Sequence, residues 1–322
     1  LLVIDKNAPT KKVYEIKKKL NKKELFFHYI RANEKNKNQD TTNKILEILL
    51  KNNFSREDCL ISVGGGITGD ISGYAASLFK RGLKFINIPT TLLAQVDSSI
   101  GGKTGVNTKH GKNLIGSFYQ PQLVISDIDF LSTLPKREVI CGYGEILKHS
   151  LISNKKLFKF LNKNFKNILA CRKPYIVKAI FESCKIKKKI VEEDEREKNT
   201  RKILNFGHTF GHAYEASLGF SKKLNHGEAI ILGMSSALQF CKLNKILSLK
   251  DYDIILNHIK NNKLPNDIKK FFSLRDTNKI LSFMMNDKKN ITNKINLILL
   301  KRIGTPLINK SFDKNKIESF FK

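Results

Sequence analysis

Cysteine is scarce in this sequence, and its distribution argues against two kinds of site. The cysteines are odd in number and lie far apart, and no two of them form a CxxC pair. A disulfide framework and a cysteine-based zinc site both need paired cysteines at characteristic spacings. We therefore expect neither, and we expect a protein of the reducing cytoplasm. The five are Cys59, Cys141, Cys171, Cys184 and Cys241.

Long apolar runs are also missing. No stretch approaches the roughly 18 apolar residues that a membrane-spanning helix requires. The sequence opens with LLVIDKNAPT, which is typical of a buried strand, so we expect no signal peptide at this end. With 322 residues, 41% of them hydrophobic, the chain is long enough for two domains with cores of their own.

Acidic residues are few, 29 against 59 lysines and arginines, which gives a formal net charge of +30. Such a charge could indicate a nucleic-acid partner. However, the lysines are spread along the whole chain, and aromatic residues do not alternate with basic clusters as in single-strand binders. We interpret the charge as a compositional bias that also suits a small anionic substrate, and we expect no nucleic-acid partner.

Strand and helix patterns alternate in the first part of the chain and favour an α/β domain with a parallel sheet. From 138 to 270 helical periodicity dominates, with one later strand-like run at 295–304. We predict a dinucleotide-binding α/β domain over 1–133 and a mainly helical domain over 134–322. The expected strands are 1–5, 25–30, 59–66, 84–91 and one within 123–135; the expected helices in this half are 10–20, 41–53 and 67–82.

Three of the seven histidines lie within the segment 204–228. His208 and His212 share one face of a helix if this stretch is helical, and a loop separates them from His226, where a second apolar run begins. Imidazole is a common metal ligand, and a catalytic zinc typically takes three protein ligands. Histidines that merely pack in a core or cap a helix are the alternative. Three of them among glycines favour a metal or phosphate site.

The segment GYGEILKHS adds further candidates at the start of the helical half. Glu145 and His149 are spaced i, i+4, and either could complete a metal site beside the histidines. Lys187 lies in a charged helix, for which a solvated face is the simplest expectation. Arg201 and Asn205 run directly into the histidine segment and indicate a donor-rich site beside the metal.

Glycines follow the third predicted strand. Gly64, Gly66 and Gly69 have GxGxxG spacing between a strand and a helix, where backbone N–H groups can approach a pyrophosphate. A tight turn is the alternative. The acidic residue expected about 20 positions later is missing, so a ribose-binding carboxylate would come from elsewhere, such as Asp5 or Glu34.

A second glycine-containing segment, PTTLLAQVDSSIGGKTGVNTKHGKNLIG, collects polar residues around paired glycines. Its GGKT is not a P-loop, because Asp97 stands where that motif requires glycine. Lys103, Lys112 and Asn113 could donate hydrogen bonds to an anion, and Asp97 could hold a hydroxyl. A polar surface loop is the alternative. The other polar members are Thr90 and Ser98.

Taken in order, these segments resemble the 3-dehydroquinate synthase family. The resemblance covers nearly the whole chain, and related families such as glycerol dehydrogenases and other sugar-phosphate cyclases share fewer of its motifs. It rests on GGGITGD, RG-x-x-FI-x-IPTTLLAQVDSSIGGKTGVN, GKN-x-IG-x-FYQP, GEILKH, DERE, LNFGHTFGHA and HGE. In this family a first strand and hairpin precede the position of Leu1.

The resemblance implies an α/β NAD-binding domain followed by a mainly helical metal- and substrate-binding domain. It implies a cytoplasmic, homodimeric carbon–oxygen lyase of the shikimate pathway. Such an enzyme converts 3-deoxy-D-arabino-heptulosonate 7-phosphate to 3-dehydroquinate and phosphate, with NAD and Zn²⁺, or Co²⁺, as cofactors.

The resemblance also implies roles for individual residues. The metal ligands are Glu145, His208 and His226, so that His212 becomes a substrate-side residue and His149 has no site role. Catalytic residues are Lys148, Lys187, Arg201, Asn205 and His212. NAD-binding residues are Asp5, Glu34, Lys37, Gly65, Gly66, Asp70, Thr90, Thr91, Lys103, Lys112 and Thr133. Substrate-binding residues are Asp97, Lys103, Lys112, Asn113, Lys288 or Lys289, and Arg81, which matches an arginine that reaches the neighbouring subunit's site.

Two other functions compete with this interpretation. A metal-dependent polyol dehydrogenase, or a cyclase for another sugar phosphate, shares the expected fold. The number of lysine, arginine and asparagine candidates favours a phosphorylated acidic substrate over a neutral polyol. A basic nucleic-acid-binding protein with a structural zinc is the third possibility, but a glutamate ligand would be unusual there.

Overall fold

The computed structural model describes residues 1–21, 23–285 and 294–321. The chain divides into two compact units, Leu1–Gly142 and Tyr143–Lys322. The boundary that we predicted between residues 133 and 134 stays a prediction. None of the helices in the described ranges combines the length and the apolar character needed to cross a bilayer.

The first unit is built on a five-stranded sheet in the order β2-β1-β3-β4-β7, and every pair in it is parallel. The alternation of strand and helix patterns predicted this arrangement, and the α/β fold class is confirmed. The last strand takes only two residues of the predicted range 123–135, because residues 128–133 form a 3-10 helix. The strands are β1 Leu2–Asp5, β2 Phe27–Ile30, β3 Cys59–Gly64, β4 Lys84–Pro89 and β7 Leu123–Val124.

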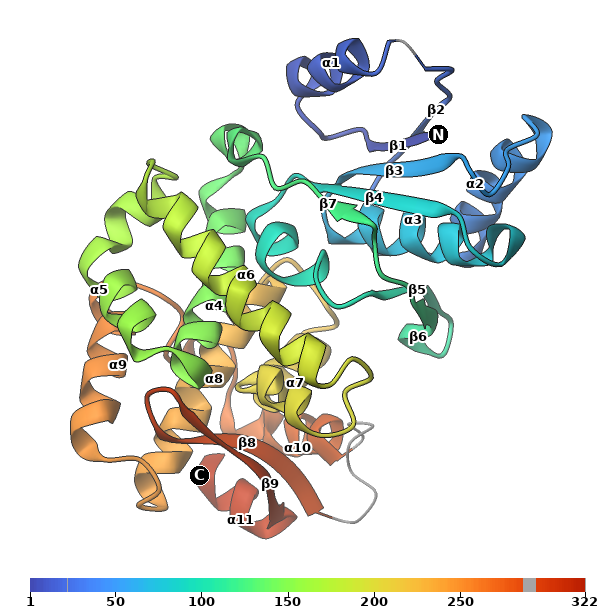
Figure 1. The fold of residues 1–322 in the computed structure, drawn as a ribbon. Helices are drawn as coiled ribbons and strands as arrows, with labels where there is room; N and C mark the ends of the chain where they lie inside the picture. Colours follow the sequence, from blue (N-terminus) through green and yellow to red (C-terminus); the bar gives the residue numbers. More distant parts are fainter. Residues whose placement is uncertain (22, 286–293, 322) are drawn as a thin grey trace. The chain divides into compact units, whose positions relative to one another are not determined.

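Helices cover both faces of this sheet (Figure 1). Val3 packs with Ile45 of α2 and Ile71 of α3, whereas Leu2 and Ile4 pack on the other face. Successive residues of a strand point to opposite faces, so a strand buried on both sides is apolar throughout, as the four residues LLVI before Asp5 are. The elements are α1 Thr10–Lys19, α2 Gln39–Lys51, α3 Gly66–Leu78, the 3-10 helices η1 Phe79–Arg81 and η3 Ile128–Thr133, and the π-helix η2 Ala94–Ser98.

A β-hairpin interrupts the sheet between β4 and β7. Strands β5 (Lys103–Thr108) and β6 (Gly111–Phe118) pair antiparallel. A polar surface loop was the alternative considered for this segment, and that alternative is wrong. Its glycines explain the close pairing: a Cβ on Gly105 would lie 2.4 Å from the Ile115 carbonyl oxygen, and one on Gly116 would lie 2.0 Å from that of Thr104.

The second unit is mainly helical, as predicted. The buried helix α8 is flanked by the other helices and by a hairpin of β8 and β9 (Figure 1). The strand-like run 295–304 is confirmed as β8, whereas its partner β9 was not predicted. The elements are α4 Lys136–Ser153, which begins in the first unit, α5 Lys155–Leu169, α6 Tyr175–Glu193, η4 Thr200–Asn205, α7 His208–Ser217, α8 His226–Leu243, α9 Leu249–Asn261, η5 Ile268–Lys270, η6 Leu274–Asp276, α10 Thr277–Met285, β8 Lys294–Arg302, β9 Thr305–Asp313 and α11 Lys314–Phe321.

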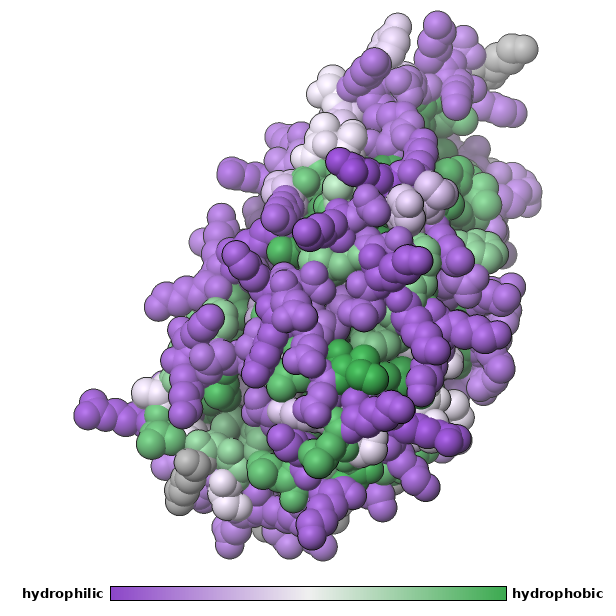
Figure 2. Space-filling view, turned by 90° about the vertical axis from the view of Figure 1, so that its left-hand side faces the viewer, coloured by the Kyte–Doolittle hydropathy of each residue, from purple (hydrophilic) through white to green (hydrophobic). Residues whose placement is uncertain are grey.

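One face of the protein shows how its hydrophilic and apolar residues are distributed. On the face drawn in Figure 2, hydrophilic side chains are spread widely and alternate with small apolar areas. Hydrophilic residues are therefore not confined to one patch of this face.

Candidate active site

The three histidines of the segment 204–228 meet where two helices begin. His208 is the first residue of α7 and His226 the first residue of α8, with His212 one turn into α7. Each offers a ring nitrogen, and these nitrogens all lie within 4.8 Å of one another. The ring centroids of His208 and His226 are 5.9 Å apart. The predicted pair of helices joined by a loop is confirmed.

Glycines allow α7 and α8 to approach closely enough for this meeting. Gly207 has φ +79°, and a Cβ there would lie 2.5 Å from Met234 Cγ. A Cβ on Gly233 would lie 2.2 Å from the Gly207 carbonyl oxygen. Only glycine combines the left-handed conformation with such close backbone contact. The glycines around the histidines therefore set the distance between the helices that carry the imidazoles.

Glu145 faces the histidines from α4. Its side chain is fully buried, its Oε1 lies 3.7 Å from His208 Nε2, and its Oε2 forms an ion pair with Lys148. Apart from that pair, neither carboxylate oxygen has a hydrogen-bond partner in the described part of the chain. A buried carboxylate is costly unless a cation or donors satisfy it. Buried carboxylate oxygens beside two or three imidazoles fit the donor set of a catalytic zinc.

The choice of ligands among these four residues stays a prediction. The three histidines are close enough to hold an ion, and Glu145 lies beside one of them, His208. His212 is exposed, whereas the other two imidazoles are partly buried. His149 is not a member of the three-histidine group, although a ring nitrogen of it lies within 4.8 Å of a Glu145 oxygen. Its Nδ1 is 2.7 Å from Ser183 Oγ on α6. This bond ties α4 to α6.

Buried cations lie on the elements around this cluster. Lys148 on α4, Lys187 on α6 and Arg201 on η4 are 1%, 6% and 2% exposed. The expectation that Lys187 lies on a solvated helix face is wrong, because α6 turns this side of the helix inward together with Ile186 and Ile190. Removing cationic groups from water is costly, so their burial supports a site for an anion.

The acidic segment 194–197 holds Arg201 and Asn205 in place. Arg201 donates from its Nη1 to the Glu195 carbonyl oxygen and from its backbone N to Asp194 Oδ2, the latter over 3.0 Å. Asn205 donates from its Nδ2 to Glu197 Oε1 over 2.6 Å. Sequence reasoning gave this DERE segment no role of its own. The signal was four consecutive charged residues shortly before a functional arginine.

In the first unit, the glycine-containing turn lies at the carboxyl end of β3. Gly64 ends the strand, Gly65 precedes α3 and Gly66 is its first residue. Among the described residues, no side chain caps the start of α3, so its first N–H groups can receive an anion. A Cβ on Gly66 would lie 2.9 Å from Ser98 Oγ. The Thr90 backbone N donates to the Gly64 carbonyl oxygen over 2.9 Å, which places Thr90 and Thr91 beside this turn.

The parallel strands bring Asp5, which is predicted to bind NAD, to the sheet edge where the glycine-containing turn lies. Asp5 ends β1, and β1, β3 and β4 run in one direction, so Asp5, Gly64 and Pro89 all lie at the carboxyl edge of the sheet. Nucleotides bind outside this edge in open α/β sheets. Glu34 lies close to the β5–β6 hairpin, where its Oε2 accepts a hydrogen bond of 2.8 Å from Asn107 and its Oε1 lies 3.2 Å from Lys112.

Lys37, which is predicted to bind NAD, contacts two other predicted site residues. Its Nζ donates to Asp70 Oδ2 over 2.5 Å and to Asn113 Oδ1 over 2.6 Å. Burial raises the pKa of Asp70, and the Lys37 ammonium opposes this shift. The network fixes the hairpin against α3.

The remaining predicted site residues of this unit are Asp97 in η2, Lys103 at the start of β5 and the exposed Arg81 at the end of η1.

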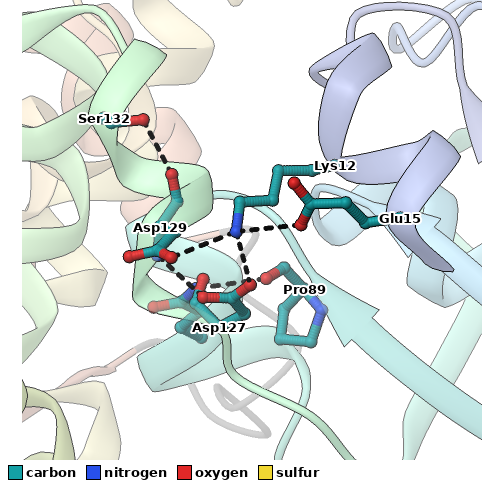
Figure 3. Close-up of polar contacts among 7 residues, drawn as sticks. Lys12, Glu15, Pro89, Asp127, Asp129 and Ser132 are labelled. Carbon is teal, nitrogen blue, oxygen red and sulfur yellow. Dashed lines mark hydrogen bonds and ion pairs between the residues drawn. The ribbon is translucent and has the colours of Figure 1, made fainter. Parts of the chain in front are cut away.

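A separate network of polar contacts surrounds η3, the helix whose last residue is Thr133 (Figure 3). Lys12 of α1 lies 3.4 Å from Asp127 Oδ2 and 3.0 Å from Asp129 Oδ2. Asp127 caps η3, the helix that ends at Thr133. The carboxylates raise the pKa of Lys12, with the hydrogen bond to Asp129 as the largest cause. Lys288 and Lys289 lie outside the described residues.

Comparison with known proteins identifies the family of this chain. The N-terminal and C-terminal family models of 3-dehydroquinate synthase match residues 27–141 and 142–290. The chain belongs to the 3-dehydroquinate synthase family. It is 63% identical over 322 residues to the 3-dehydroquinate synthase of Pelagibacter ubique, covering all of this chain and 88% of that protein. It is 46% identical over 275 residues to that of Alkaliphilus metalliredigens, covering 85% and 76%.

Solved structures of sugar-phosphate cyclases share the fold of this member of the 3-dehydroquinate synthase family. A 2-deoxy-scyllo-inosose synthase complexed with carbaglucose-6-phosphate, NAD⁺ and Co²⁺ superposes with a TM-score of 0.89 at 27% identity, covering 99% of this chain and 89% of that one. The 2-epi-5-epi-valiolone synthase of Streptomyces hygroscopicus, with NAD⁺ and Zn²⁺ bound, gives 0.84 at 25%, covering 99% and 88%. The family and function inferred from the sequence are confirmed, while the roles of individual residues stay predictions.

Proposed function

We propose that this chain eliminates phosphate from 3-deoxy-D-arabino-heptulosonate 7-phosphate and closes the product to 3-dehydroquinate, as a carbon–oxygen lyase of the shikimate pathway. The observation that carries the proposal is the buried carboxylate of Glu145 facing His208 amid buried cations. The substrate has a carboxylate and a phosphate, which these cations suit. A neutral polyol offers them no counter-charge, which argues against a polyol dehydrogenase.

The proposed cofactors are NAD⁺ and a divalent metal. NAD⁺ supplies a transient hydride acceptor, and the metal supplies a Lewis acid for the hydroxyl that is oxidised. Gly65 and Gly66 would hold the pyrophosphate at the start of α3, with Asp5 and Glu34 at the sheet edge for ribose hydroxyls. Glu145, His208 and His226 would hold the metal.

The protein's own groups then bind and orient the substrate. Lys148 and Lys187 would act as point charges toward anionic oxygens, and the Arg201 guanidinium as a planar donor fork. The segment that holds Arg201 through Glu195 and Asp194 fixes the direction of this fork. After phosphate has been eliminated, holding the open-chain molecule in a nearly cyclic pose would lower the barrier to ring closure.

The test of this function is purified protein with the heptulosonate phosphate and NAD⁺, in which inorganic phosphate and 3-dehydroquinate are followed together. We expect the two products in equal amounts and no turnover after metal is removed with a chelator. Glucose 6-phosphate serves as the matched control, because it tests for a cyclase of another sugar phosphate. Phosphate release from glucose 6-phosphate alone would contradict the assigned substrate.

We further propose a homodimer in which Arg81 reaches the partner's substrate. Arg81 is exposed and has φ +64° at the end of η1. Tyr119, just after β6, donates its hydroxyl to the Leu83 carbonyl oxygen over 2.7 Å and so connects this turn to the hairpin. The hairpin and the segment after it expose apolar side chains, as surfaces that pack against a partner do. These are Leu114, Ile115, Phe118, Leu123 and Ile125.

Subunit mixing should restore activity to two inactive variants. Arg81→Ala lacks the proposed donor, and His208→Ala lacks a metal ligand. A mixed dimer holds one site with both defects and one site with neither, so about half of the sites in mixed dimers should work if they act independently. The measurement is phosphate release after subunit exchange has been verified. No activity above either parent would contradict the arrangement, and a merely destabilised Arg81→Ala chain would indicate that Arg81 only caps its own helix.

A further inference from the structure

Glu215 is a charged residue beside the histidine cluster. It lies on α7, the helix that also carries His208 and His212, and its side chain is only 12% exposed. Its Oε2 lies 2.9 Å from Nδ1 of His226 on α8. The contact is therefore a hydrogen bond between the two helices that form the cluster, made to one of the three predicted metal ligands.

The contact selects one tautomer of His226. A carboxylate only accepts hydrogen bonds, so Nδ1 of the facing imidazole must carry the proton. In the neutral ring, Nε2 then keeps the lone pair that a metal requires. His208 is arranged in the same way, because its Nδ1 lies 3.3 Å from the Phe206 carbonyl oxygen. Its Nε2 is the nitrogen that faces Glu145.

We propose that Glu215 is a positioning residue for the metal site. It orients the His226 ring, fixes the Nε2 lone pair as the ligand and raises its basicity, without touching the metal itself. Outer carboxylates of this kind typically contribute 10- to 100-fold to metal affinity. The inference rests on the proposed function in assuming that His226 binds a metal.

Two other roles for Glu215 would give different experimental results. A purely structural link between α7 and α8 would affect thermal stability but not metal affinity. Direct ligation would make Glu215 as important as His226 itself. Zinc affinity of the full chain, measured by competition with a chromophoric chelator, distinguishes these roles without any assay of turnover.

We expect Glu215→Gln to bind zinc about 10- to 100-fold more weakly than the wild type. Glu228→Gln is the matched control, because it removes the same charge two residues from His226. Glu228 accepts from the Asn225 backbone N over 2.8 Å in the capping box that starts α8, and glutamine also serves in that motif. The control should leave zinc affinity unchanged.

A double variant separates positioning from ligation. Once His226→Ala has removed the ring, adding Glu215→Gln should cost no further affinity, because the interaction to be lost is already absent. With saturating Co²⁺, Glu215→Gln should keep the visible absorption band of the wild type, since the ligands are the same.

Three outcomes would overturn the inference. Zinc affinity of Glu215→Gln equal to that of the wild type leaves only a structural link. An affinity loss as large as that of His226→Ala, with a changed Co²⁺ spectrum, makes Glu215 a ligand. If the wild-type chain itself takes up no zinc, both the proposed function and this inference are overturned. In the first two outcomes the wild-type chain does bind zinc, so the two kinds of failure can be distinguished.

Discussion

Replacing His208 by alanine should remove both the metal and the activity of this enzyme. His208 Nε2 faces the buried Glu145 carboxylate at 3.7 Å, so the variant loses the imidazole nearest to that oxygen. A catalytic metal supplies several kcal/mol of transition-state stabilisation, and each 1.36 kcal/mol is tenfold in rate, so the turnover rate should fall by roughly 10³-fold or more. Metal content after gel filtration and phosphate release at saturating substrate are the measurements.

The neighbouring His212→Ala variant provides the control for this prediction. His212 lies on the same helix, but it is exposed and is expected to face the substrate, so the variant should lose activity and keep about one zinc per chain. The comparison is decisive because all three imidazoles are close enough to share an ion. If His212→Ala alone strips the metal, the predicted ligand set is wrong. Thermal unfolding of both variants, measured after a chelator has removed any bound metal, checks that they fold alike.

The second large effect is expected at the start of α3. Gly66→Val should reduce NAD⁺ affinity by about 100-fold or more while zinc stays bound, because a branched side chain blocks the close approach of backbone N–H groups to a pyrophosphate. Gly66 is the first residue of the helix, next to an N-terminus that no described side chain caps. Calorimetric titration with NAD⁺ measures the change, and unchanged affinity would contradict this role of the glycines.

A steric effect within the protein must be separated from a steric effect on the nucleotide. A Cβ at position 66 would lie 2.9 Å from Ser98 Oγ, so a displaced Ser98 could also disturb the site. The double variant Gly66→Val with Ser98→Gly removes that contact. If the double variant regains the wild-type affinity, the loss in Gly66→Val arises from Ser98 and not from the pyrophosphate.

Local patterns in the sequence were sufficient for the elements that carry the site. Strand β3, the glycines after it and helix α3 were predicted because an apolar run, a turn and a helical period follow one another without a break. The helices that begin at His208 and His226 were predicted for the same reason. These features depend on neighbours in the sequence, and the resemblance to the family then supplied roles that the patterns alone left open.

Burial of charge could not be predicted in this way. Lys187 lies among lysines and glutamates and has the pattern of a solvated helix, yet its side chain is 6% exposed. The buried apolar residues of α6, such as Ile186 and Ile190, recur at helical spacing and mark the side that packs inward. Lys187 lies on this side, but a local pattern gives no reason to expect a lysine to be buried there. Likewise, β9 and the β5–β6 hairpin form because each strand finds a partner strand. The partner satisfies the backbone N–H and C=O groups, and a local sequence pattern does not show which segment the partner will be.

The sequence by itself determined the alternation of strands and helices that builds the parallel sheet, the turn that begins α3 and the set of residues able to bind a metal or an anion. Only the tertiary structure decided which of these residues meet. It placed Glu145 against His208, Glu215 against His226, and Lys12 against Asp127 and Asp129. All but the Glu215–His226 contact join groups far apart in the sequence, and that one joins two different helices. The free energy of desolvating a charge depends on the whole surrounding fold, which no short stretch of sequence contains.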